Sequence, residues 1–81
     1  MKEMDLTQVE SNTKGIVAKI LGGRRMMKKL ETLGIRIGCE LEKVSSHIMR
    51  GPVVVRVGNT RAAIGYGMAK KIIIEQEKNV E

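Results

Sequence analysis

Cysteine and histidine are the most chemically versatile residues of this sequence, and each occurs once, as Cys39 and His47. A cysteine nucleophile could be activated only by this one histidine, and a metal could use the pair with help from Glu40 or Glu42. Metal sites normally gather three or four nitrogen, sulfur or oxygen ligands. Cys39 opens a predicted strand, where a cysteine is commonly a small buried hydrophobe, and His47 falls in a polar loop. We expect neither catalysis nor a metal site of high affinity, and the sequence leaves weak iron binding open.

Neither the glycines nor the carboxylates supply the parts of an active site. Gly22-Gly23 is followed by two arginines, without the lysine and the hydroxyl residue of a P-loop. The Gly-Tyr-Gly run at 65–67 lacks the further glycine of a dinucleotide-binding turn. Glu40 and Glu42 fall on one side of a predicted strand, where they are most simply solvent-facing residues. We therefore predict a protein that is not an enzyme and that uses no cofactor.

A cluster of cations is the feature that most suggests a binding function. Four of the six residues from 24 to 29 are arginine or lysine, and cations in the first turn of a helix oppose its macrodipole by about 0.3–1 kcal/mol each. Helix stability therefore does not account for them. The cluster is either a solvated helix face or a docking patch for an acidic partner or a nucleotide phosphate. The candidate partner-binding residues are Arg24, Arg25, Met26, Met27, Lys28 and Lys29.

Hydrophobic periodicity predicts the helix that carries this cluster, over residues Arg24–Leu33. Its apolar stripe consists of Met26, Met27, Leu30 and Leu33. Gly34 follows at the position where a left-handed C-terminal cap belongs. A helix of about ten residues does not persist alone in water, so the stripe must pack against the rest of the protein.

Runs of β-branched residues bounded by glycine predict five strands. They are Gly15–Leu21, Glu40–Val44, Val53–Val57, Thr60–Gly65 and Ile72–Ile74. The dipeptide Gly58-Asn59 is typical of a tight hairpin turn, and residues 66–71 allow a single helical turn. Only one crossover is long enough for a parallel unit. We predict a mainly β fold, a small five-stranded antiparallel barrel with one short α-helix between strands 1 and 2, in which closure removes the sheet edges.

Length and composition indicate one small intracellular domain. The 81 residues suit a single domain with a core at about residues 13–75, and 42% hydrophobic with 30% charged residues is a globular balance. No apolar run approaches the roughly 20 residues of a membrane span, and Met1–Asp5 does not begin a signal peptide. A single cysteine cannot form an internal disulfide, which suits a reducing compartment. We expect a cytoplasmic protein with no membrane insertion.

The charge balance and the lack of aromatic residues narrow the choice of partner. A net charge of +6 suits an acidic protein surface, a nucleic acid, an anionic membrane face or plain solubility. Tyr66 is the only aromatic residue, since the chain has no Phe and no Trp. Sites for single-stranded nucleic acid and for proline-rich peptides depend on aromatic faces. We therefore expect no nucleic-acid partner.

The order and spacing of these motifs resemble the FeoA family from about Thr13 to Glu75. The resemblance lies in the segments GIVAKILGG, RRMMKKLETLGIRIG, GPVVVRVGNTRAAIG and MAKKIIIE. It implies an SH3-like barrel and a small cytoplasmic accessory or regulatory protein of ferrous iron uptake. The implied partner is a FeoB-like membrane transporter, contacted on its cytoplasmic side. Family members often carry Pro-Gly before the first strand, where this chain has Ser11-Asn12.

Two alternative functions stay open at this stage. The same barrel resembles the C-terminal domain of DtxR-type metal-dependent repressors, which makes a regulatory interaction domain the first alternative. The second is a basic nucleic-acid-binding barrel, against which the missing aromatic platform counts. The sequence also leaves open a weak self-association and whether the protein activates, inhibits or stabilises the transporter.

Overall fold

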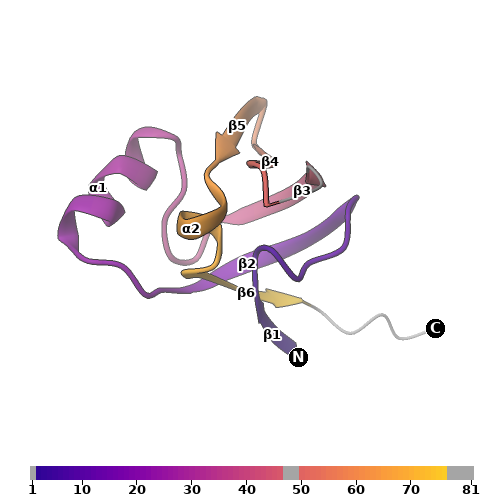
Figure 1. The fold of residues 1–81 in the computed structure, drawn as a ribbon, viewed down its shortest axis with the longest axis horizontal. Coiled ribbons are helices and arrows are strands. Elements are labelled where there is room, and N and C mark those ends of the chain that lie inside the picture. Colours follow the sequence, from indigo (N-terminus) through magenta and orange to yellow (C-terminus); the bar gives the residue numbers. More distant parts are fainter. Residues whose placement is uncertain (1, 47–49, 77–81) are drawn as a thin grey trace.

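The computed structural model describes residues 2–46 and 50–76, which form six strands and two helices (Figure 1). The elements in chain order are β1 (Lys2–Asp5), β2 (Thr13–Ile20), α1 (Arg24–Thr32), β3 (Glu40–Ser46), β4 (Val53–Val57), β5 (Thr60–Ile64), α2 (Tyr66–Ala69) and β6 (Ile72–Gln76). Neither helix has the length and apolar character needed to cross a membrane.

The strands form one antiparallel sheet in the order β1-β6-β2-β3-β4-β5. In Figure 1, β3, β4 and β5 lie above β1, β6 and β2, α2 lies between these two halves, and α1 projects to the left. The register of β2 shifts between Val17 and Lys19, and that of β3 between Lys43 and Ser45. Such irregularities bend strands and let a small sheet curve around its core.

The prediction of a mainly β, antiparallel fold is confirmed, but the prediction of five strands is wrong. The additional strand is β1, which pairs with β6 through a register that sets Met4 opposite Ile74. The sequence pattern does not predict β1, because Lys2, Glu3 and Asp5 leave no alternation of apolar and polar residues. Helix α1 consequently joins the second and third strands rather than the first and second. The predicted closure into a barrel without edges is also not seen, since β1 and β5, both fully described, end the sheet without pairing to each other.

The buried hydrophobic core contains residues from both helices, from every strand except β1 and from the connecting segments. Its buried members are Leu6, Val9, Val17, Leu30, Ile35, Leu41, Val53, Val55, Ala62, Ile64, Ala69, Ile72 and Ile74. Leu6 and Val9 precede the range of 13–75 predicted for the core. These two residues are isolated among polar neighbours and show neither helical nor strand periodicity, so the sequence gives no sign of their burial.

Helix α1 ends as its sequence predicts. Gly34 has a φ of 86°, and its N–H donates to the carbonyl of Glu31 at 2.9 Å. The N–H of Ile35 donates to the carbonyl of Leu30 at 2.9 Å. These two bonds form a Schellman motif, in which Leu30 and Ile35 make the accompanying apolar contact inside the core. The motif therefore fixes the direction in which the chain leaves the helix toward β3.

The apolar stripe of α1 packs as predicted except at one residue. Leu30 is buried, and Met26 and Leu33 are half-buried against the core. Met27 is half-buried but is not among the side chains packed against the core. A rotation of about 100° per residue puts it on the side of Leu30 away from Met26 and Leu33. Met27 therefore stays at the margin of the helix–sheet contact.

A buried lysine ties the N-terminal segment to the sheet. Lys43 on β3 is only 2% exposed, and its Nζ donates to the carbonyl of Thr7 at 3.1 Å. Burial lowers the pKa of the Lys43 ammonium, and the nearby carboxylate of Asp5 opposes this effect without reversing it. The carbonyl of Lys43 also accepts a hydrogen bond from the N–H of Asn12. The segment between β1 and β2 is thus held to β3 by polar as well as apolar contacts.

Candidate functional site

The cations of α1 lie on the surface without acidic partners. Arg24, Arg25, Lys28 and Lys29 are all exposed, and the first turn of the helix has no acidic residue. Within residues 2–46 and 50–76, the ion pairs are those of Lys19 with Glu3 and of Arg56 with Glu42, neither of which involves α1. The N-cap residue Gly23 supplies no side-chain hydrogen bond to offset the macrodipole. Within the described residues the four cations of α1 therefore form no ion pair, and Glu31 is the one acidic residue of this helix.

An apolar groove lies beside these cations. It has a volume of about 350 Å³ and is lined by Gly23, Arg25, Met26, Lys29 and Met68. Two of its lining residues are half-buried methionines, Met26 from α1 and Met68 from α2. Methionine side chains are flexible and polarizable, so they adapt to the shape of a bound apolar group. Exposed basic side chains beside half-buried methionines suit an acidic partner with an apolar anchor.

Three of the six candidate residues meet in this groove. Arg25, Met26 and Lys29 line it, whereas Arg24, Met27 and Lys28 do not. The rotation of about 100° per residue separates the two sets on α1, with Arg24 and Lys28 extending the cationic stripe next to Arg25 and Lys29. Sequence reasoning missed Met68, which lies 42 positions after Met26. The helical turn that carries Met68 was predicted, but its place beside α1 depends on the path of β3 to β5.

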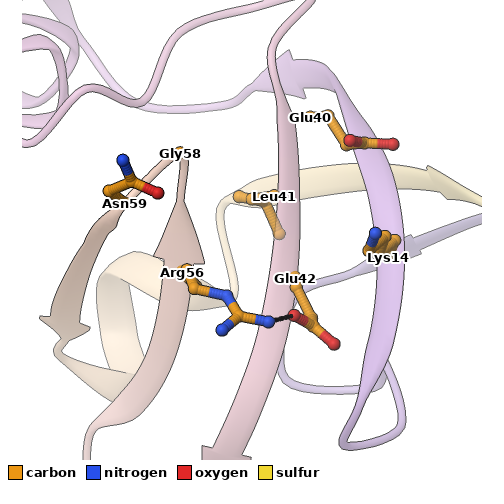
Figure 2. A pocket seen from close by; sticks show the side chains of 7 residues that line it. All are labelled: Lys14, Glu40, Leu41, Glu42, Arg56, Gly58 and Asn59. Atoms are coloured by element: carbon orange, nitrogen blue, oxygen red, sulfur yellow. Dashed lines mark hydrogen bonds and ion pairs between the residues drawn. The ribbon is translucent and has the colours of Figure 1, made fainter.

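A second, polar concavity lies across β2, β3 and β4 (Figure 2). It has a volume of about 320 Å³, and its lining consists of Lys14, Glu40, Leu41, Glu42, Arg56, Gly58 and Asn59. The guanidinium of Arg56 pairs with the carboxylate of Glu42, and Lys14 lies opposite Glu42 in the register of β2 with β3. Charges of both signs thus meet within this concavity. The carboxylates Glu40 and Glu42 face the surface, as the alternation of the strand predicted, with Glu40 exposed and Glu42 half-buried.

Cys39 is placed just before β3 and is half-buried against the core. Its Sγ accepts a hydrogen bond from the N–H of Arg36 at 3.5 Å. His47 lies outside the described residues, so the pairing of Cys39 with His47 is not addressed by the structure. In the part of the chain that the structure describes, no three Cys, His, Asp or Glu side chains gather as a metal site would require.

Comparison with known protein families shows which family this chain belongs to. The family model described as FeoA domain matches residues 4–76. The chain belongs to the FeoA domain family. The match begins at Met4 in β1 and ends at Gln76 in β6, so it includes the N-terminal strand that the sequence resemblance, starting at about Thr13, left out.

Individual relatives support the same family. The chain is 38% identical over 60 residues to the Methanocaldococcus jannaschii protein named Fe(2+) transport protein A, covering 74% of this chain and 71% of that protein. A crystal structure of an iron uptake regulatory protein, FeoA, superposes with a TM-score of 0.85 at 31% identity, covering 95% of this chain and 100% of that one. The family resemblance is therefore confirmed, and the names of both relatives refer to iron transport or iron uptake.

The FeoA fold is also found inside larger proteins. A structure described as a manganese-dependent transcriptional repressor superposes with a TM-score of 0.84 at 18% identity. The match covers 93% of this chain but only 42% of the repressor. At this level of identity the likeness shows a common SH3-like fold, in agreement with the predicted fold type.

Proposed function

We propose that this protein is an accessory, regulatory component of ferrous iron uptake that binds the cytoplasmic side of a FeoB-like transporter. Membership of the FeoA family and the name of the archaeal relative, Fe(2+) transport protein A, support a role in iron transport. The transporter as partner is the step that we add. The protein acts by binding and not by catalysis, and it needs no cofactor of its own.

The observation that supports a binding role most directly is the groove between α1 and α2. Its lining includes the exposed Arg25 and Lys29, which have no ion-pair partner within the described residues, and the half-buried Met26 and Met68. Arg25 lies in the first turn of α1, where its charge opposes the helix macrodipole and costs local stability, whereas Lys29 lies in the last turn, where a cation is favourable. The exposed charge of Arg25 therefore calls for a reason outside the fold. An acidic segment of the transporter with one apolar side chain for the groove provides that reason.

The proposal can be tested by capturing the full-length, detergent-solubilised transporter on the immobilised protein. We expect capture by the wild type and a clear loss with Arg25→Glu or Lys29→Glu. Lys2→Glu is the matched control, because it makes the same change of charge at an exposed residue of β1. Equal capture by all four proteins would exclude the α1 groove as the docking site, and no capture by the wild type would exclude the transporter as partner.

A regulatory interaction domain acting on another protein is the second candidate function. It is favoured by the shared fold with the manganese-dependent repressor. If this alternative holds, the immobilised protein should capture a repressor-type protein from the same cell and leave the transporter unbound. Binding to DNA or RNA would be recognised by a steep loss of affinity with rising salt.

A further inference from the structure

Within residues 2–46 and 50–76, the outer edge of β5 has no strand partner, and its backbone groups form a second candidate binding surface. β5 ends the sheet and has β4 as its principal neighbour. The two strands are joined by a two-residue hairpin whose first pair is Val57 with Thr60, and such hairpins close on a hydrogen-bonded pair. Hydrogen-bonded pairs alternate along an antiparallel ladder. Thr60, Ala62 and Ile64 therefore bond to β4, whereas the N–H and C=O groups of Arg61 and Ala63 point away from the sheet.

The two edges of the sheet differ in how well they are protected. β1 carries Lys2, Glu3 and Asp5 among its four residues, and short charged edge strands resist the addition of another strand. β5 carries one charge, that of Arg61, and its other outward-bonding residue is Ala63. Both side chains are exposed, and the small methyl group of Ala63 lets a second backbone approach closely. β5 is thus the edge that remains open to strand addition.

A row of charged side chains crosses the sheet and ends at this edge. Lys14 on β2 lies opposite Glu42 on β3, Glu42 lies opposite Arg56 on β4, and Arg56 lies opposite Arg61 on β5. Figure 2 shows the first three members, with Glu42 between Arg56 and Lys14 and paired to Arg56. The signs alternate until the last pair, in which two arginines face each other. Like charges directly opposite on neighbouring strands are destabilising, and Arg61 has no ion-pair partner in the described part of the chain.

We propose that β5 binds an extended segment of a partner protein, which adds to the sheet as a further strand and places a carboxylate beside Arg61. The outward backbone groups of Arg61 and Ala63 supply the main-chain hydrogen bonds, as in other cases of strand addition. The carboxylate continues the alternation of the charged row. A second copy of this chain fits less well, because it would bring another Arg61 and a further net charge of +6 to the same edge. This surface is separate from the α1 groove and does not depend on the transporter being the partner.

Amide hydrogen exchange and NMR titration of the full chain test the proposal with defined probes. The probes are three capped heptapeptides in which threonine alternates with glutamate, glutamine or lysine. We expect the glutamate peptide to shift and protect the amides of Arg61 and Ala63 while those of Thr60, Ala62 and Ile64 change little. At half-saturation the protection should be about twofold, because half of the molecules then have these amides bonded. The glutamine peptide should bind more weakly, and the lysine peptide least.

Two variants separate strand addition from general attraction to a basic protein. Ala63→Pro removes an outward N–H, a position at which an edge strand tolerates proline, and should abolish peptide binding while the fold is kept. Arg61→Glu should reverse the preference between the glutamate and lysine peptides, changing each affinity by about fivefold.

If the proline variant does not fold, the wild-type protein still tests the proposal, because strand addition should protect the amides of Arg61 and Ala63 and not those of Thr60, Ala62 and Ile64. The proposal is overturned by uniform shifts over all basic residues, by shifts confined to α1, or by no shift at millimolar peptide. It is also overturned if protection of Arg61 and Ala63 depends on protein concentration alone, which would assign the edge to a second copy of the chain.

Discussion

Leu30 anchors α1 to the sheet, and its replacement by alanine should remove a large part of the stability of the protein. The side chain is 0% exposed and belongs to the buried core. Truncation of a fully buried leucine costs about 2–5 kcal/mol, as the sum of lost burial and the cavity left behind. For a chain of 81 residues the whole free energy of unfolding is only about 4–12 kcal/mol.

The expected result can be measured by urea and thermal unfolding of Leu30→Ala. Since 1 kcal/mol shifts the Tm of so small a domain by about 4–8 °C, a loss of about 3 kcal/mol lowers it by about 12–24 °C. The urea m-value should stay unchanged, because the surface exposed on unfolding is nearly the same. Leu21→Ala is the matched control, since Leu21 is 61% exposed and the same truncation there should change the Tm little. Equal effects of the two variants would refute the packing of α1 described above.

Three further predictions concern the cap of α1, the buried lysine and metal binding. Gly34→Ala should cost about 1–2 kcal/mol because φ is 86° at this residue, whereas Gly67→Ala in α2, where an added Cβ meets open space, should be neutral or stabilising in urea unfolding. The unfolding free energy of the wild type should rise relative to that of Lys43→Met as the pH approaches 10.5, the ordinary lysine pKa. The reason is that the Lys43 ammonium has a lower pKa in the folded protein than in the unfolded chain, so the folded state loses this proton first. A difference in unfolding free energy that does not change with pH would contradict this. Anaerobic calorimetric titration with ferrous or zinc ions should give at most weak, non-stoichiometric heat, and a tight one-to-one isotherm that is lost in Cys39→Ser would show that a metal site exists.

The sequence correctly predicted the structural elements that depend only on neighbouring residues. The hairpin at Gly58-Asn59 and the cap at Gly34 follow from turn chemistry, and both are confirmed: Gly58 and Gly34 have positive φ. Strand β1 was missed because its charged residues are held by backbone pairing to β6, and the edge of a sheet does not require an apolar pattern.

Features that depend on distant parts of the chain could not be predicted. Lys43 shares a face of β3 with Leu41, and its burial is possible only because its long side chain reaches the carbonyl of Thr7, a residue 36 positions earlier. Met68 joins Met26 in the groove only through the fold of the intervening strands. The cations of α1 predicted a binding surface on this helix, but the groove beside them is also lined by Met68 of α2, which the sequence did not predict.

The measurement that tests the central proposal most directly is the rate of association with the purified transporter, followed over a range of salt concentrations. If the exposed cations of α1 guide docking, the wild type should associate more slowly as salt rises, because screening weakens the attraction between the two surfaces. The double variant Arg25→Glu with Lys29→Glu should associate more slowly at low salt and show a flatter dependence on salt. Identical rates for the wild type and the double variant at low salt would contradict the proposal that α1 is the docking surface.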